Sequence, residues 1–238
     1  MRKLFYLSIT ILLLHTISVE AQSVKIDKMI NNYLNVAFND INGLTFPLTK
    51  WENVDTIKYF IVGNQKYLSE KKWNAFLSEI EIISNLHFHE CKTITNSEIL
   101  IYIGDLKSFF EISNTDVPQK QTKELSNWSS KRWNSKYQLL WTGFCIVPDK
   151  VPSKQIGSYY LKKLFLKSLG MVSNSENEYS IYFRYYNYNA NNSTFSRADK
   201  RLLKLHYNET IKAGMTFQEV KLLITEKMDL ESLSREKL

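Results

Sequence analysis

The chain has 238 residues, of which 44% are hydrophobic and 23% are charged, and its formal net charge is +7. It holds enough apolar material for a proper core and is long enough for one domain, or one domain with an appendage. Because the basic residues mostly stand singly between acidic ones, the charge indicates a solvated surface and excludes a clustered nucleic-acid-binding patch.

The first 21 residues have the three parts of a secretory signal peptide. Arg2 and Lys3 form a positive start, residues 4–14 are apolar, and Val19-Glu20-Ala21 offers small residues at the usual cleavage positions. The apolar run is shorter than the ~20 residues that span a bilayer, so we expect no transmembrane segment in the mature chain. We expect export to the periplasm or the extracellular space, with an uncleaved N-terminal anchor as the alternative. Loss of residues 1–21 removes two basic residues and one acidic residue and changes the net charge from +7 to +6.

Helix and strand patterns alternate after the signal peptide. Apolar residues repeat at helical spacing over 24–38 and over 70–84, where Ser69 is placed to cap the second helix. A connector is expected over 39–48. Short apolar runs predict strands at 57–62, 86–91, 99–103 and 139–147.

A polar segment between residues 113 and 136 carries Trp128, Arg132 and Trp133. A loop of this length either folds its aromatic side chains back on the core or uses them as a contact surface. Further on, helical spacing returns over 159–170 and 198–207. Residues 174–196, rich in Asn, Ser and Tyr, are expected to run over the surface.

A last helix begins at Thr216, which forms a capping box with Glu219. The order of elements predicts an α+β fold with a small mixed sheet and helices packed on one face. We expect a single domain over 22–225 and a charged tail over 226–238.

Few residues are suited to metal binding or nucleophilic chemistry. Cys91 and Cys145 each end a predicted strand, and they form either one disulfide or two separate buried thiols. His87 and His89 alternate on a strand just before Glu90, so two imidazoles and a carboxylate form a weak candidate zinc site. A Cys145–His206 pair has no local support in the sequence.

The helix over 159–170 ends in Leu169-Gly170, and its length and ending suit the metal-binding helix of a zinc peptidase. Counting back from this ending, Lys163 and Lys167 occupy the two ligand positions, and Leu164 occupies the position of the general base. A protonated lysine has no lone pair for a metal ion, and leucine cannot move a proton. The two lysines then belong either to a solvated helix face or to a cationic pocket that binds an anion.

Five short segments of the C-terminal half occur in a fixed order. They are Ser168-Leu169-Gly170-Met171-Val172, Ser180-Ile181-Tyr182, Phe195-Ser196-Arg197-Ala198-Asp199, Leu202-Leu203-Lys204-Leu205-His206-Tyr207, and Lys212-Ala213-Gly214-Met215-Thr216 with Glu219-Val220. In these segments the chain resembles the bacterial domain-of-unknown-function family 2927, which is grouped with the zincin-like metallopeptidase superfamily. The resemblance covers about residues 139–224, and more loosely the chain from Trp51.

This resemblance implies a zincin-like fold and an exported protein, but it brings no catalytic residue. The acidic pair of the family's helix falls on Lys163 and Leu164, and its Gln falls on Lys167. We therefore expect a protein of unknown function, a non-catalytic relative of zincin-like metallopeptidases without a cofactor, that binds a ligand or another envelope protein. The alternatives are a zinc-dependent hydrolase with a metal site relocated to His87, His89 and Glu90, and an anion-binding module that uses Lys163 and Lys167.

Overall fold

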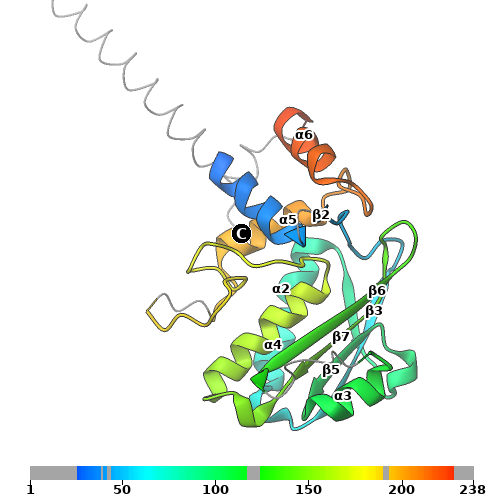
Figure 1. Cartoon of the computed structure of the whole chain (residues 1–238), viewed down its shortest axis with the longest axis vertical. Helices are drawn as coiled ribbons and strands as arrows, with labels where there is room; N and C mark the ends of the chain where they lie inside the picture. Colours follow the sequence, from blue (N-terminus) through cyan, green and yellow to red (C-terminus); the bar gives the residue numbers. More distant parts are fainter. Residues whose placement is uncertain (1–25, 39, 42–43, 117–123, 190–192, 228–238) are drawn as a thin grey trace, which may run out of the picture.

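The computed structural model describes residues 26–38, 40–41, 44–116, 124–189 and 193–227. The predicted signal peptide and the predicted tail beyond residue 227 lie outside this part of the chain. Within it, a five-stranded mixed sheet is surrounded by helices (Figure 1), and the predicted α+β class is confirmed.

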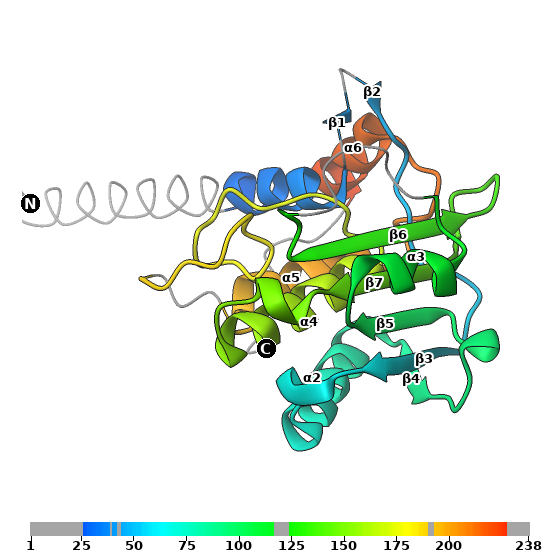
Figure 2. The same ribbon diagram turned by 60° about the horizontal axis from the view of Figure 1, so that its bottom comes forward.

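The strands of the sheet lie in the order β4-β3-β5-β7-β6, which can be followed in Figure 2. They are β3 (Thr56–Gly63), β4 (His87–Glu90), β5 (Ile99–Ile103), β6 (Asn127–Trp133) and β7 (Leu139–Ile146). β3, β4, β5 and β7 pair in parallel and are the four strands that the apolar runs predict, whereas β6 is antiparallel to β7. A separate small sheet pairs β1 (Asp40–Ile41) with β2 (Leu44–Thr45) inside the predicted connector.

The main core lies on the face of the sheet that is covered by α2 (Glu70–Ser84) and α4 (Lys154–Ser168) (Figure 1). Phe165 of α4 meets Trp73 of α2 edge to face, with ring centres 5.0 Å apart. Helix α5 (Arg197–His206) packs against α2. Ser69 stands at the N-cap of α2 as predicted, but its side chain makes no capping hydrogen bond.

The opposite face of the sheet carries a second core that the sequence did not predict. Leu100 and Tyr102 of β5 and Cys145 of β7 pack there against α3 (Leu106–Ser113). The side chain of Asp105 accepts a hydrogen bond from the backbone N–H of Ser108 (2.9 Å) and so begins α3. Helices therefore cover both faces of the sheet. The prediction that they pack on one face only is wrong, because α3 covers the other face.

The polar segment around Trp128 was predicted to be a long loop, but residues 127–133 form the edge strand β6. The side chain of Trp128 packs on the second core, whereas Trp133 is 43% exposed. Arg132 lies over the ring of Trp141, 4.6 Å from its centre, and donates hydrogen bonds to the carbonyl oxygens of Ser113 (2.6 Å) and Asn114 (3.0 Å). The strand has no apolar alternation because it pairs on one side only and much of it faces solvent.

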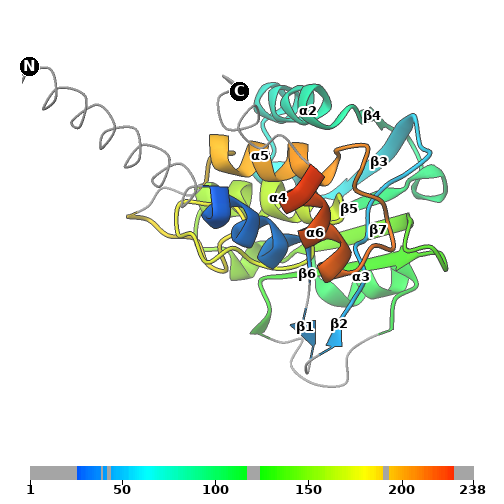
Figure 3. The same ribbon diagram turned by 90° about the horizontal axis from the view of Figure 1, so that it is seen from above.

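A group of helices closes one end of the domain, as Figure 3 shows from above. Residues 26–37 are helical, which confirms the predicted first helix within the described residues, and Phe38 contacts Phe217 of α6 (Phe217–Lys227) with ring centres 5.5 Å apart. Thr216 and Glu219 bond to each other as the predicted capping box.

The segment 174–196 differs from its prediction as a surface run. Ser180, Ile181 and Tyr182 are fully buried, while Tyr185 and Tyr188 are each 65% exposed. The segment therefore enters the core at its centre and returns to the surface. This entry point places the backbone of residues 183–184 against α4, where the candidate site lies.

Candidate functional site

Helix α4 positions the residues that the sequence singled out. It begins earlier than predicted, because the side chain of Ser153 accepts a hydrogen bond from the backbone N–H of Ile156 (3.2 Å) and caps the helix. The helix ends at Ser168 and is followed by Leu169 and Gly170. Gly170 has a φ of 113°, and a Cβ atom there would lie 2.1 Å from the carbonyl oxygen of Thr49, so the turn requires glycine.

Lys163 is buried rather than solvated, with 5% of its surface exposed. Its ammonium group donates to the carbonyl oxygen of Phe183, to that of Arg184 (3.1 Å) and to the hydroxyl oxygen of Tyr159 (3.2 Å). The three N–H donors of an ammonium group are all used by these contacts. The solvated-face reading is wrong at this position, because Lys163 ties α4 to the backbone of residues 183–184.

Lys167 lies one turn further along α4 on the same side and is half-buried. Its Nζ donates to Oδ1 of Asn174 (3.0 Å). Its backbone carbonyl oxygen accepts a hydrogen bond from Nζ of Lys131 (2.6 Å), which reaches across from β6. Lys131 and Asn174 were not predicted as site residues, since each is brought to α4 by tertiary packing and neither lies in a recognisable motif.

Several basic side chains lie near one another around α4 and lower each other's pKa values. Burial, with the charges of Lys167 and Arg184, lowers the pKa of Lys163 to about 7. Burial and the charge of Arg184 lower the pKa of Lys167 to about 8, and burial and the charge of Lys167 lower that of Lys131 to about 7. Of the described residues, those that form ion pairs are Lys107 with Glu111 and Lys200 with Glu79, and neither pair includes one of these cations.

Side chains from three other parts of the chain cap the C-terminal end of α4. The indole N–H of Trp51 donates to the carbonyl oxygen of Ser168 (3.0 Å), and the hydroxyl of Tyr207 donates to that of Leu169 (2.7 Å). Trp51 and Tyr207 thus provide donors to carbonyl groups at the end of the helix, and Lys131 is a second donor to the carbonyl oxygen of Lys167, which also accepts from the backbone N–H of Gly170 (3.1 Å). The end of α4 is thus fixed from several directions, which holds Lys163 and Lys167 in place.

Leu164, at the position that the spacing from Gly170 predicts for a general base, is 5% exposed and belongs to the main core. Nζ of Lys163 is directed to oxygen atoms of residues 159, 183 and 184, and Nζ of Lys167 is bonded to Asn174, so the two amines are engaged with different protein groups and not with a shared metal position. These residues do not fit a divalent metal ion. In the described part of the chain, no three His, Cys, Asp or Glu residues are grouped closely enough to hold one.

The candidate zinc site on β4 is not assembled. Phe88 and Glu90 pair with Ile57 and Tyr59, which face the main core, so the alternating His87 and His89 point to the other face. Both histidines are exposed, and Oε2 of Glu90 accepts a hydrogen bond from the hydroxyl of Tyr59 (3.5 Å). Strand alternation therefore separates the carboxylate from the two imidazoles.

Cys91 and Cys145 are free thiols in the structure. Cys91 follows the edge strand β4, whereas Cys145 lies in β7, three strands away, which corresponds to ~14 Å at the usual spacing of strands. A disulfide needs Cα atoms less than ~7 Å apart, so of the two alternatives the disulfide does not form in this fold, and the cysteines are separate thiols, of which Cys145 is buried and Cys91 is partly exposed. Cys145 also faces the second core while His206 lies in the main core region, and the sheet keeps the two apart.

Several segments on which the family resemblance rests have a structural role. The carboxylate of Asp199 is fully buried and accepts four hydrogen bonds. Two come from the hydroxyl of Ser180 and the backbone N–H of Ile181 (3.2 Å). The other two come from the backbone N–H (3.1 Å) and the hydroxyl (2.6 Å) of Ser196. Burial raises the pKa of Asp199 although these donors oppose the shift. This carboxylate joins α5 to the segment that carries Phe183 and Arg184, and so holds the oxygen acceptors of Lys163 in position.

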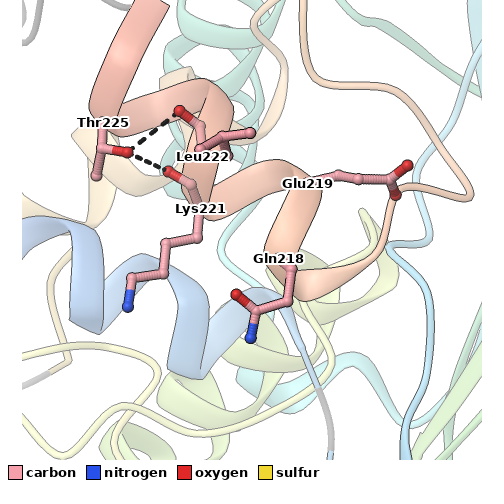
Figure 4. A pocket seen from close by; sticks show the side chains of 5 residues that line it. All are labelled: Gln218, Glu219, Lys221, Leu222 and Thr225. Atoms are coloured by element: carbon pink, nitrogen blue, oxygen red, sulfur yellow. Dashed lines mark hydrogen bonds between the residues drawn. The ribbon is translucent and has the colours of Figure 1, made fainter.

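A shallow surface hollow lies against α6, lined by Gln218, Glu219, Lys221, Leu222 and Thr225 (Figure 4). The hydroxyl of Thr225 is directed back to the carbonyl oxygens of Lys221 (3.0 Å) and Leu222 (3.2 Å), so it bonds within the helix. The lining residues all come from one exposed helix, and they do not converge on a common point.

Of the helices in the described residues, none is long and apolar enough to span a membrane.

The structure therefore defines a mixed α/β domain in which a central helix presents buried and half-buried cations to a loop. The family model described as "Protein of unknown function (DUF2927)" matches residues 27–226, and the chain belongs to this family. This confirms the family that the five C-terminal segments indicate and extends the match to almost the whole predicted mature domain. No curated protein matches the chain.

Proposed function

We propose that this chain is an exported, non-catalytic relative of the zincin-like metallopeptidases, which acts by binding a partner or ligand in the cell envelope or outside the cell. The observation that supports this most strongly is the environment of Lys163. At a position where a metal-binding helix needs a ligand, an ammonium group donates to the oxygen atoms of Phe183, Arg184 and Tyr159. The side chain holds the fold together and is not available for chemistry on a substrate.

The neighbouring positions support the same proposal. Leu164 lies in the core, where a carboxylate would be costly to bury, and Lys167 is bonded to Asn174. Export is supported by the sequence of residues 1–21, with its positive start, apolar run and small residues before Gln22. The zincin-like relationship is supported by the Leu169-Gly170 pair at the end of α4, where Gly170 has a positive φ.

Metal content and peptidase activity of the purified chain test the non-catalytic proposal. We expect substoichiometric zinc after exposure to zinc and dialysis, and no cleavage of a mixed peptide library above the rate of a heat-denatured sample. Stoichiometric zinc together with cleavage would overturn it. In that case the double variant His87→Ala/His89→Ala identifies whether β4 supplies the ligands, since zinc that survives both changes must be bound elsewhere.

Export is tested separately by expressing the full chain in a bacterium and sequencing the N-terminus of the protein recovered from the periplasm and the medium. We expect the mature chain to begin at Gln22. A protein that stays in the cytoplasm with its first 21 residues intact would contradict export, whatever the result of the metal assay.

A further inference from the structure

Four basic residues lie near one another where β6, α4 and the segment after Tyr182 come together. The charge of Lys167 acts on Lys131 and Lys163, and the charge of Arg184 acts on Lys163 and Lys167. Nζ of Lys131 contacts the backbone of Lys167, and Nζ of Lys163 contacts the backbone of Arg184. Lys163 and Lys167 are four residues apart on α4 and thus lie on the same side of the helix. Three separate parts of the chain therefore bring like charges together, which costs free energy unless something of opposite charge is near.

Within the described residues, the hydrogen-bond and ion-pair partners of these four basic groups include no carboxylate. Lys50 provides a contrast. It is also buried, but the charge of Glu52 acts on it and favours its protonated form. At α4 the partial negative charge is that of backbone carbonyls near the helix C-terminus, which offsets only a part of the repulsion.

The four basic groups differ in how many of their N–H donors are already bonded to protein acceptors. Those of Lys163 are used by three protein oxygen atoms, and Lys131 is engaged with the carbonyl oxygen of Lys167. Lys167 is half-buried and donates to Asn174 alone among the described residues, although an ammonium group has three donors. Arg184 is exposed and carries a guanidinium group with five donors.

We propose that Lys167 and Arg184, with the side-chain amide of Asn174, form a binding site for the oxyanion group of a ligand, such as a phosphate, a sulfate or a carboxylate. An exposed arginine can bind such a group in a bidentate manner, and a half-buried ammonium group strengthens the attraction because screening by water is reduced. Lys131 and Lys163 add positive potential from behind the site. The inference names the chemistry of the ligand and so rests on the proposed binding function.

Proton uptake is the second signature of such a site. Lys163 and Lys167 have pKa values of about 7 and about 8 because they are buried among other cations. An oxyanion next to them favours their charged forms and raises both pKa values. Binding at pH 8 is therefore coupled to the uptake of protons, whereas general screening by salt has no such stoichiometry.

Inorganic phosphate is the first probe, titrated into the purified full chain by calorimetry at pH 7 and pH 8, with sodium chloride added to keep the ionic strength constant. We expect saturable binding at one site and proton uptake that is larger at pH 8, measured in buffers of different ionisation enthalpy. Lys167→Met and Arg184→Gln should each weaken binding at least about tenfold, which is the loss expected for one charge-assisted hydrogen bond. Lys107→Met, which removes an exposed lysine of α3, is the matched control and should bind phosphate as the unchanged chain does.

Phosphate that acts no differently from chloride, or an affinity that Arg184→Gln leaves unchanged in a folded protein, would overturn the inference. Arg184 is exposed, so its replacement keeps the test valid even if Lys167→Met does not fold. Acetate, sulfate and a glycerol phosphate ester, tested in parallel, distinguish a carboxylate ligand from free phosphate and from a phosphorylated headgroup. Failure of the phosphate titration leaves the metal and peptidase results standing, and the two proposals are therefore judged independently.

Discussion

Raising the pH from 7 to 9 should stabilise the folded protein, and Lys163 should account for a measurable share of the gain. Burial places its pKa at about 7 in the folded state, against an ordinary value of 10.5. Between these two values the unfolded chain binds more protons than the folded chain at this site. The free energy of unfolding therefore rises with pH in this window, and the penalty of burying the charge is fully present below pH 7.

The magnitude follows from the two pKa values. One pKa unit corresponds to about 1.4 kcal/mol, so the titration of Lys163 raises the free energy of unfolding by about 2 kcal/mol between pH 7 and pH 9. No reduction for solvent exposure is needed, because 5% of the residue is exposed. Lys131, Lys167 and Lys50, whose pKa values are also lowered, act in the same direction. Most proteins are most stable between about pH 5 and pH 8, so a continued rise to pH 9 distinguishes this chain.

Urea denaturation of the unchanged chain and of Lys163→Met, each at pH 7, 8 and 9, measures the effect. The absolute stability of the variant is not diagnostic, because methionine removes a buried charge and also leaves the carbonyl oxygens of Phe183 and Arg184 without their donor. The difference in slope is diagnostic: we expect the variant to gain about 2 kcal/mol less than the unchanged chain between pH 7 and pH 9. Equal slopes would refute the reasoning, and Lys107→Met, which alters an exposed lysine, should keep the original slope.

Three further substitutions test the parts of the structure that hold the site, each by urea denaturation. Gly170→Ala should cost about 3 kcal/mol, since the new Cβ would lie 2.1 Å from the carbonyl oxygen of Thr49 at a positive φ; a loss below about 1 kcal/mol would argue against this turn. Asp199→Ala should cost about 3 kcal/mol, because it leaves Ser180 and Ser196 without their buried acceptor; a neutral effect would mean that the carboxylate is not buried as described. Leu164→Glu, which places a carboxylate at the position predicted for a general base, should cost at least about 3 kcal/mol and produce no peptidase activity, whereas a stable variant that cleaves peptides would contradict the core position of Leu164.

Elements with strong apolar periodicity could be predicted from the sequence, and those without it could not. All five residues of β5 are buried, and α2 matches its predicted bounds of 70–84. Helix α3 was missed because it is short and directly follows Gly104 and Asp105, which indicated the end of a strand and not the N-cap of a helix. Strand β6 was missed because the edge of a sheet does not require apolar residues on alternate positions.

The site was predictable in its residues but not in its environment. The spacing from Gly170 picks out Lys163 and Lys167, yet nothing near them in sequence shows that Lys163 is buried, since two of its three acceptors lie about twenty residues further along the chain. Alternation along β4, in contrast, already separates Glu90 from His87 and His89. That part of the zinc hypothesis could have been rejected from the sequence alone.

A buried ammonium group and a metal ion can serve a fold in a similar way, since each is a cation that joins separate segments through oxygen atoms. Lys163 joins α4 to the backbone of residues 183–184 with two such contacts and makes a third to Tyr159 of α4, while Asp199 joins the same segment to α5. A lysine differs from a metal centre in leaving no open coordination position for a substrate or for water. Its charge remains, and together with Lys167 and Arg184 it provides the positive potential that the proposed oxyanion site needs. Lysines at these two positions therefore supply no metal ligand, and their positive charge is the property on which the proposed binding function rests.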